Sequence, residues 1–85
     1  MLAITIYTKS YCPYCANAKK LLKAKGYTFE DIDIIGNEEL ALQVAERSGR
    51  RTVPQIFVGE HSVGGYDDLV KIADNGKFDA LVRGQ

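Results

Sequence analysis

"KSYCPYCANAKKLL", residues 9–22, contains two cysteines three positions apart with a proline between them, and then continues in a helical pattern. Ala18, Leu21 and Leu22 recur at i, i+3 and i+4, which predicts one apolar helix face, and Gly26 predicts the end of that helix. The preceding stretch, residues 2–7, is an apolar β-branched run without polar alternation, typical of a strand covered on both faces. The cysteine pair therefore lies where a predicted strand gives way to a predicted helix.

The rest of the chain continues this alternation of strands and helices. A second strand is predicted over 27–34, a helix from Asn37 to Gly49, a hairpin of 54–58 with 61–65, and a last helix over 66–76 with one further turn. The order βαβ followed by ββα predicts an α/β fold: a four-stranded mixed sheet flanked by helices. This architecture is similar to that of thioredoxin.

Composition limits the possible classes of function. The chain has 85 residues, 46% of them hydrophobic, which predicts one domain over 1–85. Eleven basic and eleven acidic side chains give no net charge, so a nucleic-acid partner is not expected. Arg47, Arg50 and Arg51 form the only basic cluster, which we interpret as a solvated helix end.

The sequence also indicates a location. The first ten residues lack the features of a secretory signal, and no apolar run approaches the ~20 residues that span a bilayer. We therefore expect a cytoplasmic protein with no membrane partner. Structural disulfides are rare in that compartment, so two cysteines there indicate a redox role.

Three kinds of site use a pair of cysteines. Structural zinc requires four ligands, and the chain offers one cysteine pair and His61, which we interpret as a surface side chain, so no metal is expected. A structural disulfide closing so short a loop would constrain the unfolded chain little. A CxxC motif within a βαβ pattern is instead typical of thiol–disulfide exchange.

The position of each cysteine predicts its role. Cys12 lies at the helix start, where the helix dipole and the free amides of Tyr14 and Cys15 favour a thiolate, and Pro13 suits the first helical position. Cys15 lies one turn deeper on the same face. We therefore predict that Cys12 is the nucleophile and that Cys15 resolves the mixed disulfide formed at Cys12.

Three segments together carry a family resemblance. With "CPYC" at 12–15, "TVPQIFV" at 52–58 and "GGYDDL" at 64–69, the chain resembles the glutaredoxins of the dithiol class, of the small bacterial type, over essentially its whole length. The resemblance implies a glutathione-dependent oxidoreductase that reduces protein disulfides and glutathione mixed disulfides. Its implied partners are glutathione and disulfide-containing or glutathionylated proteins, and we expect a monomer.

The resemblance also implies a groove beside Cys12. Pro54 is expected to be cis, so that the N–H and C=O of Val53 face the sulfur and pair with glutathione as an added strand would. Thr52 is expected to form a polar edge of this groove, and Tyr14 to flank the bound tripeptide.

Glutathione has two carboxylates and one ammonium, and the resemblance assigns a partner to each. Lys9 meets the glycine carboxylate, the amides of Tyr66 and Asp67 after Gly65 meet the other, and the Asp67 side chain holds the ammonium. Capping of the last helix is the alternative role for the two aspartates. Ala41 stands where some members have a glutamine facing the glycine carboxylate.

Two alternative functions stay open at this level. Some glutaredoxins carry an iron–sulfur cluster between two chains, but Pro13 and a resolving cysteine count against this, since an intramolecular disulfide competes with thiolate ligation. The other alternative is a protein of the same fold that thioredoxin reductase reduces; the "GGYDDL" segment and Lys9 favour glutathione instead.

Overall fold

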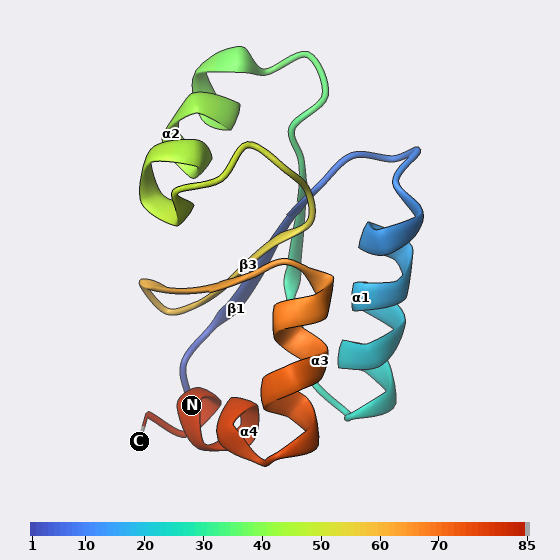
Figure 1. The fold of residues 1–85 in the computed structure, drawn as a ribbon, viewed down its shortest axis with the longest axis vertical. Coiled ribbons are helices and arrows are strands. Elements are labelled where there is room, and N and C mark those ends of the chain that lie inside the picture. The colour runs from blue at the N-terminus through green and yellow to red at the C-terminus, as the bar shows by residue number, and fades with distance from the viewer. Residues whose placement is uncertain (85) are drawn as a thin grey trace.

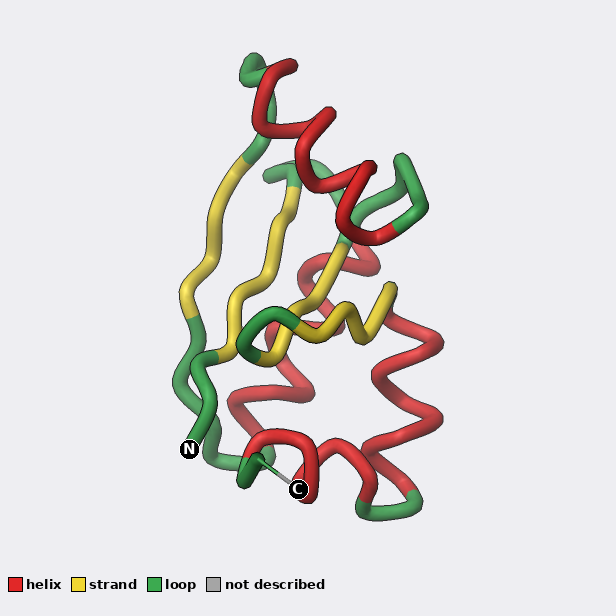
Figure 2. Tube along the Cα trace, turned by 90° about the vertical axis from the view of Figure 1, so that its left-hand side faces the viewer, coloured by secondary structure: helices red, strands yellow, loops and turns green. Residues whose placement is uncertain are grey.

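The computed structural model describes residues 1–84 and forms an α/β fold around one sheet (Figure 1). Its elements are β1 (Ile4–Thr8), α1 (Pro13–Ala24), β2 (Glu30–Asp33), α2 (Glu38–Ser48), β3 (Gln55–Val58), β4 (His61–Gly64), α3 (Tyr66–Asp74) and α4 (Lys77–Val82). The strand order is β2-β1-β3-β4, with β1 and β2 parallel and the other two pairs antiparallel. The predicted four-stranded mixed sheet is thus confirmed, and Figure 2 shows its strands as one twisted layer.

Helices cover both faces of this sheet, because both faces of β1 and β3 are apolar. Ile6 and Ile56 are paired in register and point to the face where α1, α3 and α4 lie together in Figure 1. Tyr7 and Phe57 point to the other face, where Val44 of α2 packs against them. The prediction of a first strand covered on both sides is confirmed.

Predicted caps set the ends of α2. The Asn37 side chain accepts a hydrogen bond from the Leu40 amide at 3.1 Å, which satisfies a free donor of the first turn. Gly49 closes the helix in the left-handed region at φ 77°, a conformation that costs glycine little. No helix within residues 1–84 is long and apolar enough to cross a membrane.

Some boundaries differ from the prediction. β1 covers residues 4–8 and not 2–7, and β2 begins at Glu30, so Tyr27 and Phe29 pack against the core from the loop before it. The predicted further turn of the last helix is a separate helix, α4, because Gly76 turns the chain at φ 80°. Gln85, the last residue of the predicted domain, lies outside the described residues.

Arg47 makes contacts that the sequence did not predict. Its guanidinium carbon lies 4.3 Å from the centre of the Phe57 ring, and its Nη1 donates to the Tyr7 hydroxyl at 3.3 Å. Arg47 is exposed in the last turn of α2, as predicted for a solvated helix end, and its guanidinium also covers the Phe57 ring.

Candidate active site

Cys12 occupies the N-cap position of α1, directly before Pro13. Its own amide donates to the Lys9 carbonyl at 3.1 Å, which closes a turn at the end of the loop after β1. The Cys15 amide donates to the Cys12 sulfur at 3.2 Å. Of the two amides that the sequence indicated, that of Cys15 therefore reaches the sulfur, and a donor at this distance stabilises a thiolate.

Cys15 has a different environment, although both cysteines are free thiols. Its side chain is 1% exposed, on the inner face of α1 with Ala18 and Leu22. Burial, together with the hydrogen bond between the two thiols, raises the pKa of Cys15 to about 12. The pair therefore combines a partly exposed sulfur at the helix start with a buried, protonated one.

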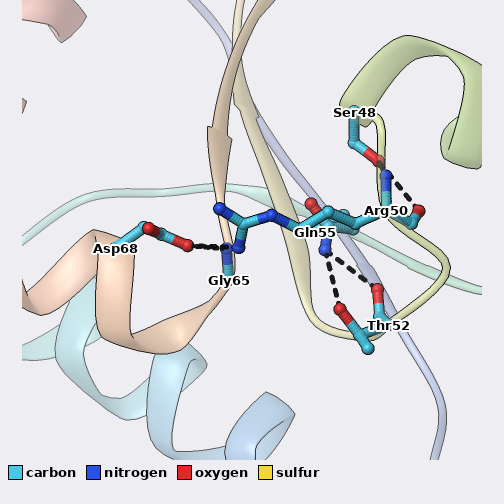
Figure 3. A network of polar contacts seen from close by, with 6 residues as sticks. All are labelled: Ser48, Arg50, Thr52, Gln55, Gly65 and Asp68. Atoms are coloured by element: carbon cyan, nitrogen blue, oxygen red, sulfur yellow. Dashed lines mark hydrogen bonds and ion pairs between the residues drawn. The ribbon is translucent and has the colours of Figure 1, made fainter.

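The loop before β3 lies against the Cys12 sulfur. The Val53–Pro54 peptide bond is cis, as the family resemblance implied, and the Cys12 thiol donates to the Val53 carbonyl at 3.6 Å. Gln55 is fully buried, and its Nε2 donates to the carbonyl (3.0 Å) and the hydroxyl (3.3 Å) of Thr52 (Figure 3). Since the Gln55 backbone pairs with Tyr7 of β1, these bonds anchor the loop to the sheet.

A groove of about 320 Å³ adjoins this loop. Its walls come from α1, the loop before β3 and the start of α3, and the rings of Tyr14 and Tyr66 lie 6.3 Å apart across it. The predicted residues that line it are Tyr14, Thr52, Val53, Pro54, Gly65, Tyr66 and Asp67. A larger hollow, about 530 Å³, lies between residues 1–5 and 26–30, and it includes none of the predicted site residues.

Lys9 lies beside this groove and not in it. It lines an adjoining hollow of about 200 Å³, together with Ala41 of α2. Arg50 and Thr52 line both hollows, so the two are neighbours.

Sequence reasoning missed Arg50. Its Nη1 lies 2.6 Å from Oδ2 of Asp68, and the same oxygen accepts from the Gly65 amide at 2.9 Å (Figure 3). The hydrogen bond from Arg50 and, to a smaller extent, the one from the Gly65 amide hold the pKa of Asp68 below its usual range. The basic cluster before the "TVP" segment was the only signal for this bridge between the loop and α3. Arg50 is exposed, as predicted, but the sequence did not predict its ion pair with Asp68.

The two aspartates at the start of α3 thus differ. Asp68 caps the helix, which was the alternative role considered for both. Asp67 is exposed and forms no hydrogen bond or ion pair within the described part of the chain. Its carboxylate therefore remains available to a cation in the groove.

Comparisons with known proteins agree with this geometry. The family model described as Glutaredoxin matches residues 4–63. A glutaredoxin of Pseudomonas aeruginosa is 48% identical over 82 residues, which cover 96% of this chain and 98% of that protein. Glutaredoxin 3 of Escherichia coli is 45% identical over 83 residues, which cover 98% of this chain and all of that protein.

Solved structures show the same likeness. The solution structure of a Brucella melitensis glutaredoxin is 51% identical with a TM-score of 0.85, covering 96% of this chain and 89% of that one. A crystal structure of a buckwheat glutaredoxin–glutathione complex is 26% identical with a TM-score of 0.89, covering 98% of this chain and 78% of that one. With a CxxC pair at the helix start and matches over nearly its whole length, the chain belongs to the glutaredoxin family of thiol–disulfide oxidoreductases.

Proposed function

We propose that this protein is a glutathione-dependent oxidoreductase that reduces protein disulfides and glutathione mixed disulfides through Cys12 and Cys15. The observation that carries the proposal is the environment of the Cys12 sulfur. At the helix start it accepts a hydrogen bond from the Cys15 amide, and it contacts the loop that lines the groove. The buckwheat relative in complex with glutathione supports this choice of ligand.

The first step uses Cys12 as the nucleophile. Its thiolate attacks one sulfur of the substrate disulfide, a new bond forms between Cys12 and that sulfur, and the other sulfur leaves as a thiolate. Once the Cys12 thiol has lost its proton, it no longer donates to the Val53 carbonyl. That carbonyl is then free to accept an N–H of the substrate backbone, as a strand edge does.

Two routes complete the cycle. In the dithiol route, Cys15 loses its proton and attacks the Cys12 sulfur, the substrate leaves as a thiolate, and two glutathiones reduce the Cys12–Cys15 disulfide while they form one glutathione disulfide. In the monothiol route, Cys12 removes glutathione from a mixed disulfide, and a second glutathione regenerates Cys12. Only the dithiol route requires Cys15.

The groove offers partners for the charges of glutathione. Tyr66 and Asp67 are at the start of α3, where free amides suit a carboxylate, and the unpaired Asp67 side chain suits the ammonium. Lys9 and Arg50, in the adjoining hollow, suit the glycine carboxylate. The backbone of Val53 and the ring of Tyr14 would hold the centre of the tripeptide.

The remaining parts of the proposal concern the setting of the enzyme. We propose that it acts as a monomer in the cytoplasm on disulfide-containing or glutathionylated proteins, without a metal and without nucleic-acid or membrane partners. A reducing compartment would keep the pair in the dithiol state that the mechanism requires.

Two serine variants test the proposal in two assays. Cys15→Ser should retain removal of glutathione from a small mixed disulfide, yet lose most reduction of a protein disulfide such as that of insulin. Cys12→Ser should lose both activities, because no nucleophile remains. Mild and equal losses from the two variants would refute the assigned roles.

A further inference from the structure

The resolving step requires a buried thiol to ionise. Cys15 is 1% exposed, and its pKa is raised to about 12. A thiol attacks a disulfide as its thiolate, so the protein needs a positive charge that favours the ionised Cys15 at that moment. The Cys15 amide cannot serve, because it is directed at Cys12.

Lys19 is the positively charged side chain of α1 that is closest to Cys15 by helical spacing. It lies four residues after Cys15 in α1, and residues at i and i+4 are neighbours on a helix surface. Its side chain is only 32% exposed, and its ammonium lies 2.8 Å from Oδ2 of Asp31 on β2. The lysine is therefore tied to β2 by a partly exposed ion pair.

Asp31 is itself held in place. Its Oδ1 accepts a hydrogen bond from the hydroxyl of Thr8 at 2.6 Å, and Thr8 is buried at the end of β1, where the chain turns toward the cysteines. Burial alone would raise the pKa of Asp31, but the bonds from Lys19 and Thr8 outweigh it and keep that pKa below its usual range. The carboxylate thus stays charged and fixes the ammonium of Lys19.

The electrostatic effects agree with this placement. Burial first, then the hydrogen bond to Cys12 and its charge, raise the pKa of Cys15, whereas a hydrogen bond from the backbone of Lys9 and, less strongly, the charge of Lys19 lower it. Lys19 is therefore the side chain whose charge favours the Cys15 thiolate, alongside the backbone of Lys9. From β2, Asp31 and Asp33 both raise the pKa of Lys19, as does Cys15, so the lysine remains an ammonium. Its neighbour Lys20 is exposed and makes no ion pair within residues 1–84.

We propose that Lys19 is a positioning residue for the resolving step, in which its ammonium, fixed by Asp31, stabilises the Cys15 thiolate. In that step the Cys15 thiol releases its proton to solvent, its sulfur bonds to the Cys12 sulfur, and the bond from Cys12 to the substrate sulfur breaks to release a thiolate. The inference rests on the proposed function, since it requires the dithiol route.

Ellman's reagent separates the two steps in one reaction. The reduced protein should release a first thionitrobenzoate when Cys12 attacks the reagent and a second when Cys15 resolves the adduct, and stopped-flow absorbance records both phases. Lys19→Met should slow the second phase roughly three- to tenfold, the size expected for one nearby charge, and leave the first unchanged. Lys19→Arg should restore it, and Lys20→Met, on the solvent side of α1, should match the wild type.

The outcomes are distinguishable. A second phase unaffected in Lys19→Met, or slowed equally in Lys20→Met, would overturn the inference, and so would an equal slowing of both phases, which would place the effect on Cys12 or on the fold. Should Lys19→Met fail to fold, Lys19→Gln provides the same test. The proposed function is tested separately, because a wild-type protein that shows both phases yet fails to turn over glutathione mixed disulfides would refute glutathione dependence alone.

Discussion

Cys12 and Cys15 are one helical turn apart, and yet their surroundings predict different reactivity. With iodoacetamide at pH 7, Cys12 should be alkylated while Cys15 remains unmodified, because Cys15 is 1% exposed and its raised pKa keeps it protonated. Peptide mapping by mass spectrometry after a short reaction measures this. In urea both should react at similar rates, and similar rates in the native protein would contradict the assignment.

Arg50 provides a second prediction at the level of single residues. Arg50→Gln should raise the KM for a glutathione mixed disulfide about two- to fivefold, with little change in kcat, because it removes the proposed charge contact with the ligand and the exposed ion pair to Asp68, while no group at the sulfur changes. Steady-state kinetics at low and high salt measure this, and the variant should be the less sensitive to salt. Lys20→Gln removes a charge elsewhere and is the control; an unchanged KM in Arg50→Gln would exclude Arg50 from binding.

The same residues show how far sequence reasoning reaches. The positions of Cys12 and Cys15 follow from a proline and a helix start that are local in the chain, so their placement was predictable. The Arg50–Asp68 bridge joins residues 18 positions apart, and nothing local in either one specifies the partner. The cis bond at Pro54 came from family resemblance, because sequence favours trans at most prolines.

α4 illustrates the energetics of a whole element. It has only six residues, too few for a stable isolated helix, so packing must hold it, and Phe78 and Val82 are both buried in the core with Leu69 of α3. Phe78→Ala should lower the free energy of unfolding by about 3–5 kcal/mol. Urea denaturation followed by circular dichroism measures the loss.

A control in the same helix isolates that effect. Lys77→Ala changes an exposed side chain one residue earlier, and it should alter the free energy of unfolding by less than about 0.5 kcal/mol. Equal losses from the two substitutions would show that packing of the Phe78 ring is not what holds α4 to the core.

Element boundaries were less predictable than element types. Tyr27 and Phe29 have the apolar alternation of a strand, but they pack against the core from a loop. Their side chains are apolar because they are partly buried, and not because their backbone pairs with another strand. α4 continues the apolar pattern of α3, and a glycine at φ 80° separates the two helices. Sequence periodicity indicates which face is buried, whereas tertiary pairing decides where a strand or helix ends.

At the scale of the whole molecule, three carboxylates link stability to pH. Asp31, Asp68 and Asp79 each have a lowered pKa. At Asp31 the hydrogen bonds from Lys19 and Thr8 outweigh the effect of burial. The main cause is the bond from Arg50 at Asp68, and the bond from the Tyr27 hydroxyl at Asp79. A carboxyl whose pKa is lower in the folded state binds fewer protons there, so it stabilises the fold above the unfolded value of about 3.9 and loses this as pH falls.

The expected result is a stability that declines on the acid side. The free energy of unfolding in urea should change little between pH 7 and about pH 5, and it should fall steadily below about pH 4 as these carboxylates become protonated. Asp31→Asn should make the decline shallower. A stability that rose as the pH fell below 4 would contradict the ion pairs described for the native state.

The account as a whole depends on glutathione being captured at the first cysteine and released by the second. The most direct measurement is intact-mass and peptide-mapping mass spectrometry after the reduced wild type and Cys15→Ser react with a limiting amount of glutathione disulfide. The account predicts a stable glutathione adduct at Cys12 in Cys15→Ser, and a Cys12–Cys15 disulfide without an adduct in the wild type. An adduct at Cys15 of the wild type, or no adduct on Cys15→Ser, would contradict it.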